Sequence, residues 1–158
     1  MTGGRAVHDV MQAIKAVSLP PVSTPRGSYT PILRSGEFVF VSGQGPRWGD
    51  ELRYKGKVDC DLTVEQGQEA ARLCALNIIA QLNGFLNHDL RRVQQVVRVA
   101  GVVRCADIFE KQALVMNGAS DLFLEIFGER GRHVRIATGT SALPSGMAVE
   151  VEAMFRVI

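Results

Sequence analysis

The spacing of hydrophobic residues changes several times along this chain, and the order of those changes restricts the fold more than any other feature. Alternation or β-branched runs predict strands, and apolar residues three and four positions apart predict helices. The predicted elements follow the pattern βββαβαββ, at about residues 28–33, 38–42, 52–58, 63–85, 96–103, 113–127, 133–142 and 148–157. Because strands and helices do not alternate strictly, we expect an α+β fold in which a mixed sheet carries two helices on one face.

The first predicted helix carries the clearest local signals. Thr63 and Gln66 match a capping box, in which two side chains satisfy backbone donors that the start of a helix leaves unpaired. Apolar residues then recur on one side of the helix, at Ala71, Cys74, Ile78, Leu82 and Phe85. We expect this side to pack on the sheet.

The second predicted helix and the last two strands complete the pattern. The apolar residues that this helix should turn inward are Leu114, Leu122, Ile126 and Phe127. In the last strand, apolar and polar positions alternate from Val149 to Arg156. Since Leu143-Pro144-Ser145-Gly146 has the composition of a turn, we expect the two strands to form a C-terminal hairpin.

A chain of 158 residues, 46% hydrophobic and 22% charged, has the size and composition of one globular domain. Residues 1–18 are expected to form an N-terminal helical arm, and residues 19–158 a single domain. The sheet face without helices would need cover, which small proteins commonly obtain by self-association.

The charge and the cysteines exclude several classes of function. A net charge of +2 gives little attraction to nucleic acid. No apolar run is long enough to span a membrane, and the start of the chain has no signal-type core, so we expect a cytoplasmic protein. Three widely spaced cysteines without a CxxC pair suggest neither a disulfide framework nor a metal site.

Three segments resemble a known family. Arg135-Ile136-Ala137-Thr138-Gly139-Thr140-Ser141-Ala142-Leu143-Pro144, followed by Val149-Glu150-Val151-Glu152, is similar to the signature of the reactive-intermediate deaminase (YjgF-like) family. Gly27-Ser28-Tyr29-Thr30-Pro31 and Phe40-Val41-Ser42-Gly43-Gln44 resemble its earlier segments, in the family's order. The resemblance runs from about residue 19 to residue 157.

The resemblance implies a chorismate-mutase-like fold and a homotrimer with clefts between subunits. Family members are hydrolases that convert small 2-imino acids, formed from enamines such as 2-aminoacrylate, to 2-keto acids and ammonia without a metal or organic cofactor. The segments 117–123 and 131–135 look like a particular branch of the family. Ala137 stands where some members have a cysteine, so the reaction transfers less securely than the carboxylate anchor.

Four residues match the family's site. The resemblance implies that Arg135 binds the substrate carboxylate, for which the guanidinium fork is suited, although a lone arginine on a strand is more often a surface group. It implies that Glu150 moves protons in the cleft, although strand glutamates usually face solvent. Tyr29 would close the cleft and touch the substrate or water, or else pack at a subunit contact. Gly43 would let its peptide groups reach the ligand, or else simply end a strand.

Two further residues are secondary candidates. His133 lies two positions before Arg135 and could titrate near neutral pH, although such a histidine is more often structural. Glu152 shares a strand face with Glu150 and could instead form a salt bridge at an interface.

Three functions remain open at the level of the sequence. The favoured one is an imine deaminase. The second is a non-catalytic protein that binds or senses small carboxylates with the same arginine. The third is ribonuclease action, which some relatives carry as a label, but three scattered histidines and a small net charge give it little support.

Overall fold

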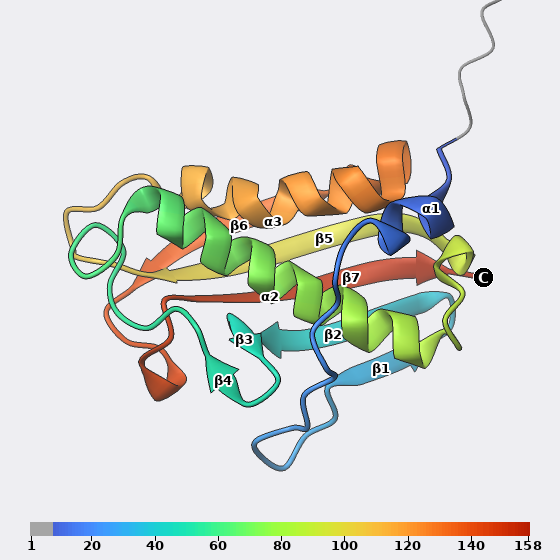
Figure 1. The fold of residues 1–158 in the computed structure, drawn as a ribbon, viewed down its shortest axis with the longest axis horizontal. Coiled ribbons are helices and arrows are strands. Elements are labelled where there is room, and N and C mark those ends of the chain that lie inside the picture. The colour runs from blue at the N-terminus through green and yellow to red at the C-terminus, as the bar shows by residue number, and fades with distance from the viewer. Residues whose placement is uncertain (1–7) are drawn as a thin grey trace, which may run out of the picture.

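The computed structural model describes residues 8–158, which form a five-stranded sheet covered on one face by two helices (Figure 1). The strands are β1 (Ile32–Ser35), β2 (Phe38–Gln44), β5 (Val93–Arg104), β6 (Val134–Thr140) and β7 (Val149–Val157), in the spatial order β1-β2-β7-β5-β6. Neighbouring strands are antiparallel except β5 and β6, which are parallel. The expected α+β fold with a mixed sheet is confirmed.

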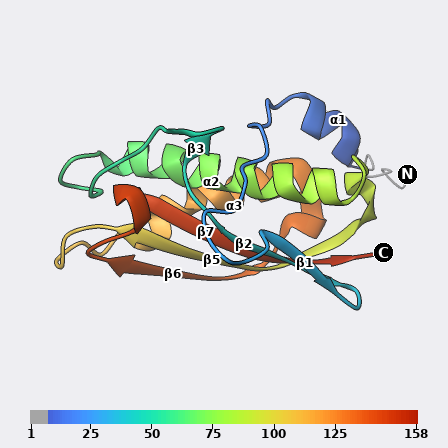
Figure 2. The same ribbon diagram turned by 90° about the horizontal axis from the view of Figure 1, so that it is seen from below.

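The two long helices, α2 (Val64–Phe85) and α3 (Gln112–Phe127), lie side by side on the sheet (Figure 2). The capping box of Thr63 and Gln66 is present at the start of α2, as predicted. At Gly118 of α3, an added Cβ would collide with the backbone of Gln68, so the glycine permits this close helix crossing. Phe85 and Leu114 were expected to face inward, but both are exposed because they lie at helix ends.

The expected C-terminal hairpin is wrong. β6 and β7 follow each other in the sequence, but β5 lies between them in the sheet. β6 pairs with β5 in parallel, through the connection formed by α3, and β7 pairs with the other edge of β5. The connection from β6 to β7, which contains the short helix η3 (Pro144–Gly146), therefore passes the end of β5. This arrangement separates Arg135 on β6 from Glu150 on β7.

Two other elements differ from the expectation. The third predicted strand, about residues 52–58, does not form: only Leu52 lies in a strand, and Lys55 and Val58 make isolated bridges. A short hairpin outside the main sheet, made of β3 (Arg47–Trp48) and β4 (Glu51–Leu52), stands in its place. The first strand begins at Ile32 rather than near Ser28, since a tight turn in which Tyr29 N donates to Gly27 O precedes it. The loop from residue 20 to 31 and the β3–β4 hairpin therefore lie outside the main sheet.

The remaining elements close one end of the fold. Helix α1 (Val10–Lys15) is capped by Asp9 and buries Val10 against the core. Residues 1–7 of the expected N-terminal arm lie outside the described part of the chain. Short 3₁₀ helices η1 (Leu90–Arg92) and η2 (Gly128–Gly131) flank β5 and α3. Within residues 8–158, none of the helices has the length and apolarity to cross a membrane.

The second face of the sheet is left without a covering element in the described chain (Figure 2). Large apolar side chains stand exposed on it, including Leu33 at 57%, Phe40 at 44% and Ile136 at 50% of their surface. The strand registers align Leu33 with Phe40, Phe40 with Met154, and Arg98 with both Met154 and Val134. A mainly apolar stripe therefore crosses the whole sheet.

Candidate functional site

Three of the residues predicted from the sequence line one pocket. Tyr29, Gly43 and Glu150 border a cavity of about 400 Å³ at the end of β2. Its other walls come from the 20–31 loop, the start of the β3–β4 hairpin and the loop around η3. The fold therefore brings together the cleft tyrosine, the glycine and the glutamate expected from the sequence.

Gly43 is required by the position of Glu150. The pairing of β2 with β7 is irregular between Val41 and Gln44, which brings the backbone of Gly43 against the Glu150 side chain. A Cβ on residue 43 would collide with Oε1 of Glu150. The absent side chain thus creates the space that the carboxyl group occupies.

The surroundings of Glu150 favour its protonated form. Glu150 is partly buried, and burial raises its pKa above the ordinary glutamate value, with a further contribution from the charge of Glu152. Glu152 lies outside the pocket and forms an ion pair with Arg98, 3.1 Å from Nη1 to Oε1, on the open face of the sheet. A carboxyl group with a raised pKa is suited to accepting and returning a proton near neutral pH.

Arg135 lies elsewhere, on the helix side of edge strand β6. Its Nη1 donates to Oδ1 of Asn117 and to Oγ of Ser120, both at 3.0 Å, and its Nη2 donates to the backbone oxygen of Ala113 at 3.0 Å. These three acceptors all belong to α3. A guanidinium group has five N–H donors, so about two remain for a ligand, the number that a bidentate carboxylate accepts.

His133 joins the same cluster. Its Nδ1 lies 2.6 Å from the backbone oxygen of Gly131 and its Nε2 lies 2.9 Å from Oγ of Ser120. Because the carbonyl oxygen can only accept, Nδ1 carries the proton, and the neutral ring accepts from the Ser120 hydroxyl through Nε2. Burial lowers the pKa of His133, and the charge of Arg135 lowers it further. His133 therefore fixes Ser120, which in turn holds Arg135.

The sequence did not single out Asn117 and Ser120 as site residues. Both lie in the segment 117–123, which resembles a particular branch of the family. The sequence therefore marked this segment, but it gave neither residue a role. Their position one helical turn apart on α3, facing β6, brings both side chains to Arg135.

Within one chain, Arg135 and Glu150 cannot act on one small molecule. Val102 of β5 pairs with both Thr138 and Glu150, so Arg135 lies three residues along and two strands away from Glu150. That offset is about 10 Å along the strands and about 9.5 Å across them. The two side chains also lie on opposite faces of the sheet, since Arg135 contacts α3.

Two buried amides of α2, which the sequence also did not reveal, position the pocket walls. Nδ2 of Asn77 donates to the backbone oxygen of Arg47 at 2.7 Å, and Nε2 of Gln81 donates to that of Ser23 at 3.0 Å. Only 3% of Asn77 and 5% of Gln81 is exposed. Their signal in the sequence was a polar residue within the apolar side of a helix.

Metal binding has no geometric basis in the described residues. Between residues 8 and 158, no group of three or more His, Cys, Asp and Glu side chains comes close enough to hold an ion. The three cysteines are free, with Cys74 and Cys105 buried and Cys60 exposed.

Comparisons with known proteins agree with this fold. Residues 10–153 match the model of the family described as "YjgF/chorismate_mutase-like, putative endoribonuclease". The chain is 42% identical over 142 residues to protein TCP17 of Trypanosoma cruzi, covering 89% of this chain and 88% of that protein.

Two solved structures are also similar along nearly their whole length. The Agrobacterium tumefaciens protein Atu1372, of unknown function, is 36% identical with a TM-score of 0.88, covering 94% of this chain and 92% of that chain. A Shewanella oneidensis protein described as "a putative endoribonuclease" is 34% identical with a TM-score of 0.90, covering 95% of this chain and 100% of that chain.

Proposed function

Since the chain belongs to the YjgF/chorismate-mutase-like family, we propose that it hydrolyses small 2-imino acids to 2-keto acids and ammonia, in a site completed by a second copy of the chain. The observation that carries the proposal is the pocket in which Glu150, with a raised pKa, lies against the backbone of Gly43 and beside Tyr29. In such a pocket, the Glu150 carboxyl group can transfer protons next to the accessible backbone of Gly43.

The chemistry assigns a role to each group. Arg135 binds the carboxylate of the 2-imino acid with its two remaining donors, which orients the imine carbon. The Glu150 carboxylate takes a proton from a water that attacks this carbon, and the C–O bond forms as the C=N π electrons move to nitrogen. Glu150 then returns this proton to nitrogen, which gives a carbinolamine. It next carries the hydroxyl proton to nitrogen as the C–N bond breaks, so that ammonia leaves and the keto group forms. Tyr29 closes the pocket over the reacting water.

In a homo-oligomer, Arg135 of one copy can lie close to Glu150 of another copy. The uncovered sheet face carries the stripe of Leu33, Phe40, Met154 and Val134, which is the kind of apolar surface that protein interfaces bury. The family resemblance implies a homotrimer. In that assembly, Arg135 of one copy reaches the Glu150 pocket of its neighbour.

The test is keto-acid release from imines that an amino-acid oxidase generates in the assay. The wild-type protein should accelerate release, and Glu150→Gln should lower kcat by about 10²- to 10⁴-fold while leaving the oligomer intact. Glu129→Gln is the matched control, because Glu129 pairs with Arg132 at the surface, 2.8 Å away, outside the pocket. A wild-type protein that accelerates no imine would refute the proposal.

A second candidate function is carboxylate binding without catalysis. It is favoured by Arg135, whose three hydrogen bonds to α3 hold it firmly whether or not a reaction occurs. Under this function, a 2-keto acid raises the melting temperature with increasing occupancy. Glu150→Gln then leaves that effect unchanged, and no imine is consumed.

Ribonuclease action, suggested by names among the relatives, ranks behind both. Paired acid–base groups are not found among the described histidines: His8 contacts the backbone oxygen of Ile126, His88 contacts Asn83, and His133 contacts Ser120. None of these histidines contacts another.

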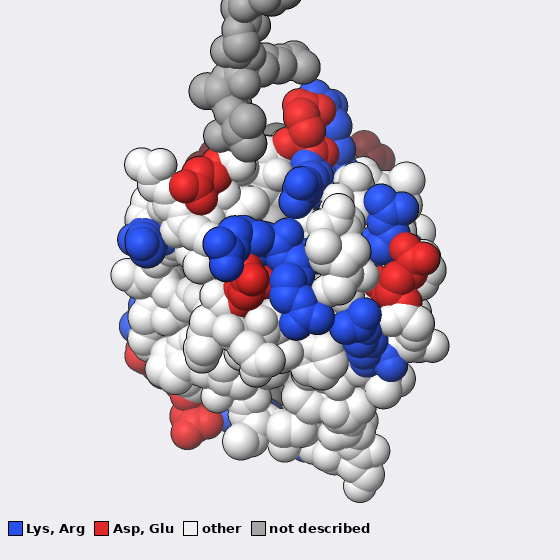
Figure 3. Space-filling view, turned by 90° about the vertical axis from the view of Figure 1, so that its right-hand side faces the viewer, with Lys and Arg blue, Asp and Glu red and all other residues white. Residues whose placement is uncertain are grey.

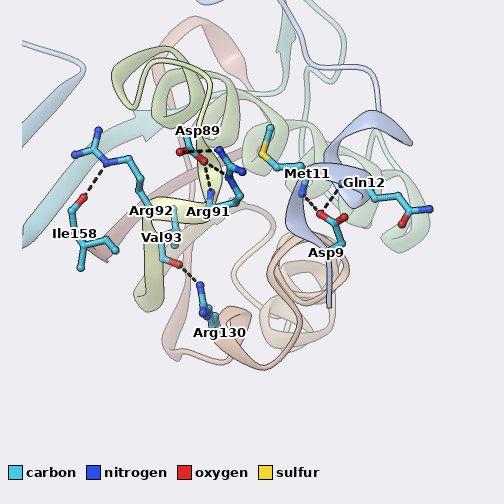
Figure 4. Close-up of polar contacts among 9 residues, drawn as sticks. All are labelled: Asp9, Met11, Gln12, Asp89, Arg91, Arg92, Val93, Arg130 and Ile158. Carbon is cyan, nitrogen blue, oxygen red and sulfur yellow. Dashed lines mark hydrogen bonds and ion pairs between the residues drawn. The ribbon is translucent and has the colours of Figure 1, made fainter. Parts of the chain in front are cut away.

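The face shown in Figure 3 also gives no support to an RNA track. Figure 3 shows Lys and Arg side chains gathered at one end of the molecule, with acidic side chains among them. Three arginines there bind groups of the chain itself (Figure 4): Arg91 pairs with Asp89 at 2.7 Å, Arg92 donates to the backbone oxygen of Ile158, and Arg130 donates to that of Val93. These contacts connect η1, η2 and the end of β7, so we assign this face a structural role.

A further inference from the structure

A pair of arginines lines the Glu150 pocket and has no part in the reaction described above. Arg26 comes from the loop before β1, and Arg47 comes from β3. The pKa of Arg47 is lowered, first by burial and then by the positive charge of Arg26. Two arginines from different segments of the chain therefore line the same pocket.

Neither charge is strongly neutralised by the protein. Nη1 of Arg47 donates at 3.0 Å to the backbone oxygen of Asp50, which carries no formal charge. The Asp50 carboxylate lies 3.4 Å from Nη2 of Arg26, but its side chain is fully exposed, so solvent screens the pair. Glu150, the only carboxyl among the described lining residues, has a raised pKa. The pocket thus carries a surplus of positive charge.

The wall that carries these arginines is preformed. The buried amide of Asn77 holds the backbone of Arg47 itself, and that of Gln81 holds Ser23, three residues before Arg26. Buried hydrogen bonds of this kind fix the course of a loop, because breaking one leaves a polar group unpaired in the interior. The backbone at Arg47 and near Arg26 is therefore held in place before a ligand binds.

We propose that Arg26 and Arg47 form a subsite for a second anionic group, so that the preferred substrates are 2-imino acids with a side-chain carboxylate, such as those derived from aspartate and glutamate. The proposal rests on the proposed function, in which Arg135 of a neighbouring copy binds the α-carboxylate. The side-chain carboxylate then lies against Arg26 and Arg47, with Glu150 facing the imine carbon between the two anchors. The cavity of about 400 Å³ lies within the range of small-molecule sites, about 300–1,000 Å³.

The test compares kcat/KM for imines generated from glutamate or aspartate with kcat/KM for imines from alanine or 2-aminobutyrate. The wild-type protein should prefer the dicarboxylic imines, and Arg47→Gln or Arg26→Gln should lower that selectivity ratio about tenfold to hundredfold. Arg47→Lys, which keeps the charge, should retain part of the preference. An equal loss toward both classes would overturn the subsite, because the arginines would then bind the carboxylate that all the substrates share.

Arg53→Gln is the matched control for these variants. It removes the same charge beside the same hairpin, but Arg53 stacks on Trp48, 5.0 Å from the ring centre, and does not line the pocket. Its selectivity ratio should equal that of the wild-type protein. A fall as large as that of Arg47→Gln would mean that net charge, and not the pocket, determines the preference, and would overturn the proposal.

Binding separates the subsite from the reaction. 2-Oxoglutarate should raise the melting temperature of the wild-type protein more than 2-oxobutanoate does, and Arg47→Gln should remove the difference. If no imine is hydrolysed but this difference is found, the subsite holds and the proposed deaminase reaction fails. If both keto acids stabilise equally while imines are hydrolysed, the deaminase reaction holds and the subsite fails.

Discussion

Gly43 and Glu150 lie in contact because residue 43 has no side chain. The Glu150 carboxyl group occupies the volume that a Cβ of residue 43 would need. The sequence predicted both residues as site candidates through the family resemblance, but not that one makes room for the other. Their proximity depends on the irregular pairing of β2 with β7, which the local sequence does not specify.

Gly43→Ala should therefore displace the Glu150 carboxyl group. Because a shift of about 1 Å in a reacting group can cost about 10²-fold in rate, we expect a loss of that order in kcat with the fold retained. Gly84→Ala is the control, since a Cβ there meets open space within α2 and should add about 0.5–1 kcal/mol of stability. Wild-type activity in Gly43→Ala would contradict the role of this contact.

The pH dependence of activity should report on Glu152. The pKa of Glu150 is raised by burial and then by the charge of Glu152, so the acid limb of the kcat profile should lie above the ordinary glutamate value of 4.5. Glu152→Gln removes the second contribution and should move this limb to lower pH. A limb that stays in place or moves upward would show that Glu150 is not the titrating base.

The stability that Glu150 itself contributes follows the same shift in pKa. Its folded-state pKa is raised, so the contribution is present below the unfolded pKa and is lost as the pH rises through the folded pKa. Glu150→Gln should flatten this part of the stability profile. Thermal unfolding of both proteins at pH values from 4 upward measures the difference.

At the scale of elements, α2 connects the core to the pocket. Asn77 and Gln81 lie on its buried side but hold the loops that carry Arg47 and Ser23. The apolar spacing predicted the helix, yet it treated this side as uniformly hydrophobic. The buried amides are functional exceptions within a packing surface.

Asn77→Leu should loosen the pocket wall. The change leaves the backbone oxygen of Arg47 without its donor in a buried place, which costs about 1–3 kcal/mol, and it should raise KM because the loop moves. Thr63→Ala is the matched variant, since it removes the cap of the same helix, costs about 1 kcal/mol and lies outside the pocket. If both variants change KM equally, general destabilisation explains the effect.

Strand pairing marks the limit of what the sequence predicts at this scale. Helix boundaries and capping follow from residues close together in the chain. The predicted boundaries are confirmed for α2 and α3, and the predicted capping box for α2. The placement of β5 between β6 and β7 depends on contacts among strands that are far apart in the sequence. The turn-like segment from Leu143 to Gly146 suggested a hairpin. A segment of the same composition can also connect two strands that have a third strand between them, as β6 and β7 have β5.

At the scale of the whole molecule, one chain holds two incomplete parts of a site. The Arg135 cluster is built on β6 and α3, and the Glu150 pocket lies between β2, β7 and the loops. All six residues predicted from the sequence lie in or beside one of these parts. Their separation within one chain could not be predicted, because it follows from the strand order.

Phe40→Asp should disrupt the assembly that joins the two parts. Phe40 lies in the exposed stripe, so a charge there would oppose burial of this face between copies. We expect a folded monomer without deaminase activity. Ile108→Asp is the control, because Ile108 is 90% exposed in the loop before α3, away from the sheet. Sedimentation velocity distinguishes the species, and an unchanged oligomer in Phe40→Asp would exclude this face as the interface.

Mixing two inactive variants tests the shared site most directly. Arg135→Ala and Glu150→Gln are unfolded together, refolded as a mixture, and assayed for imine hydrolysis beside each variant refolded alone. In a randomly mixed cyclic trimer, about one site in four combines an intact Arg135 with an intact Glu150 from its neighbour, so about a quarter of wild-type activity should return. If mixed oligomers form and no activity returns, Arg135 and Glu150 do not share a site between copies.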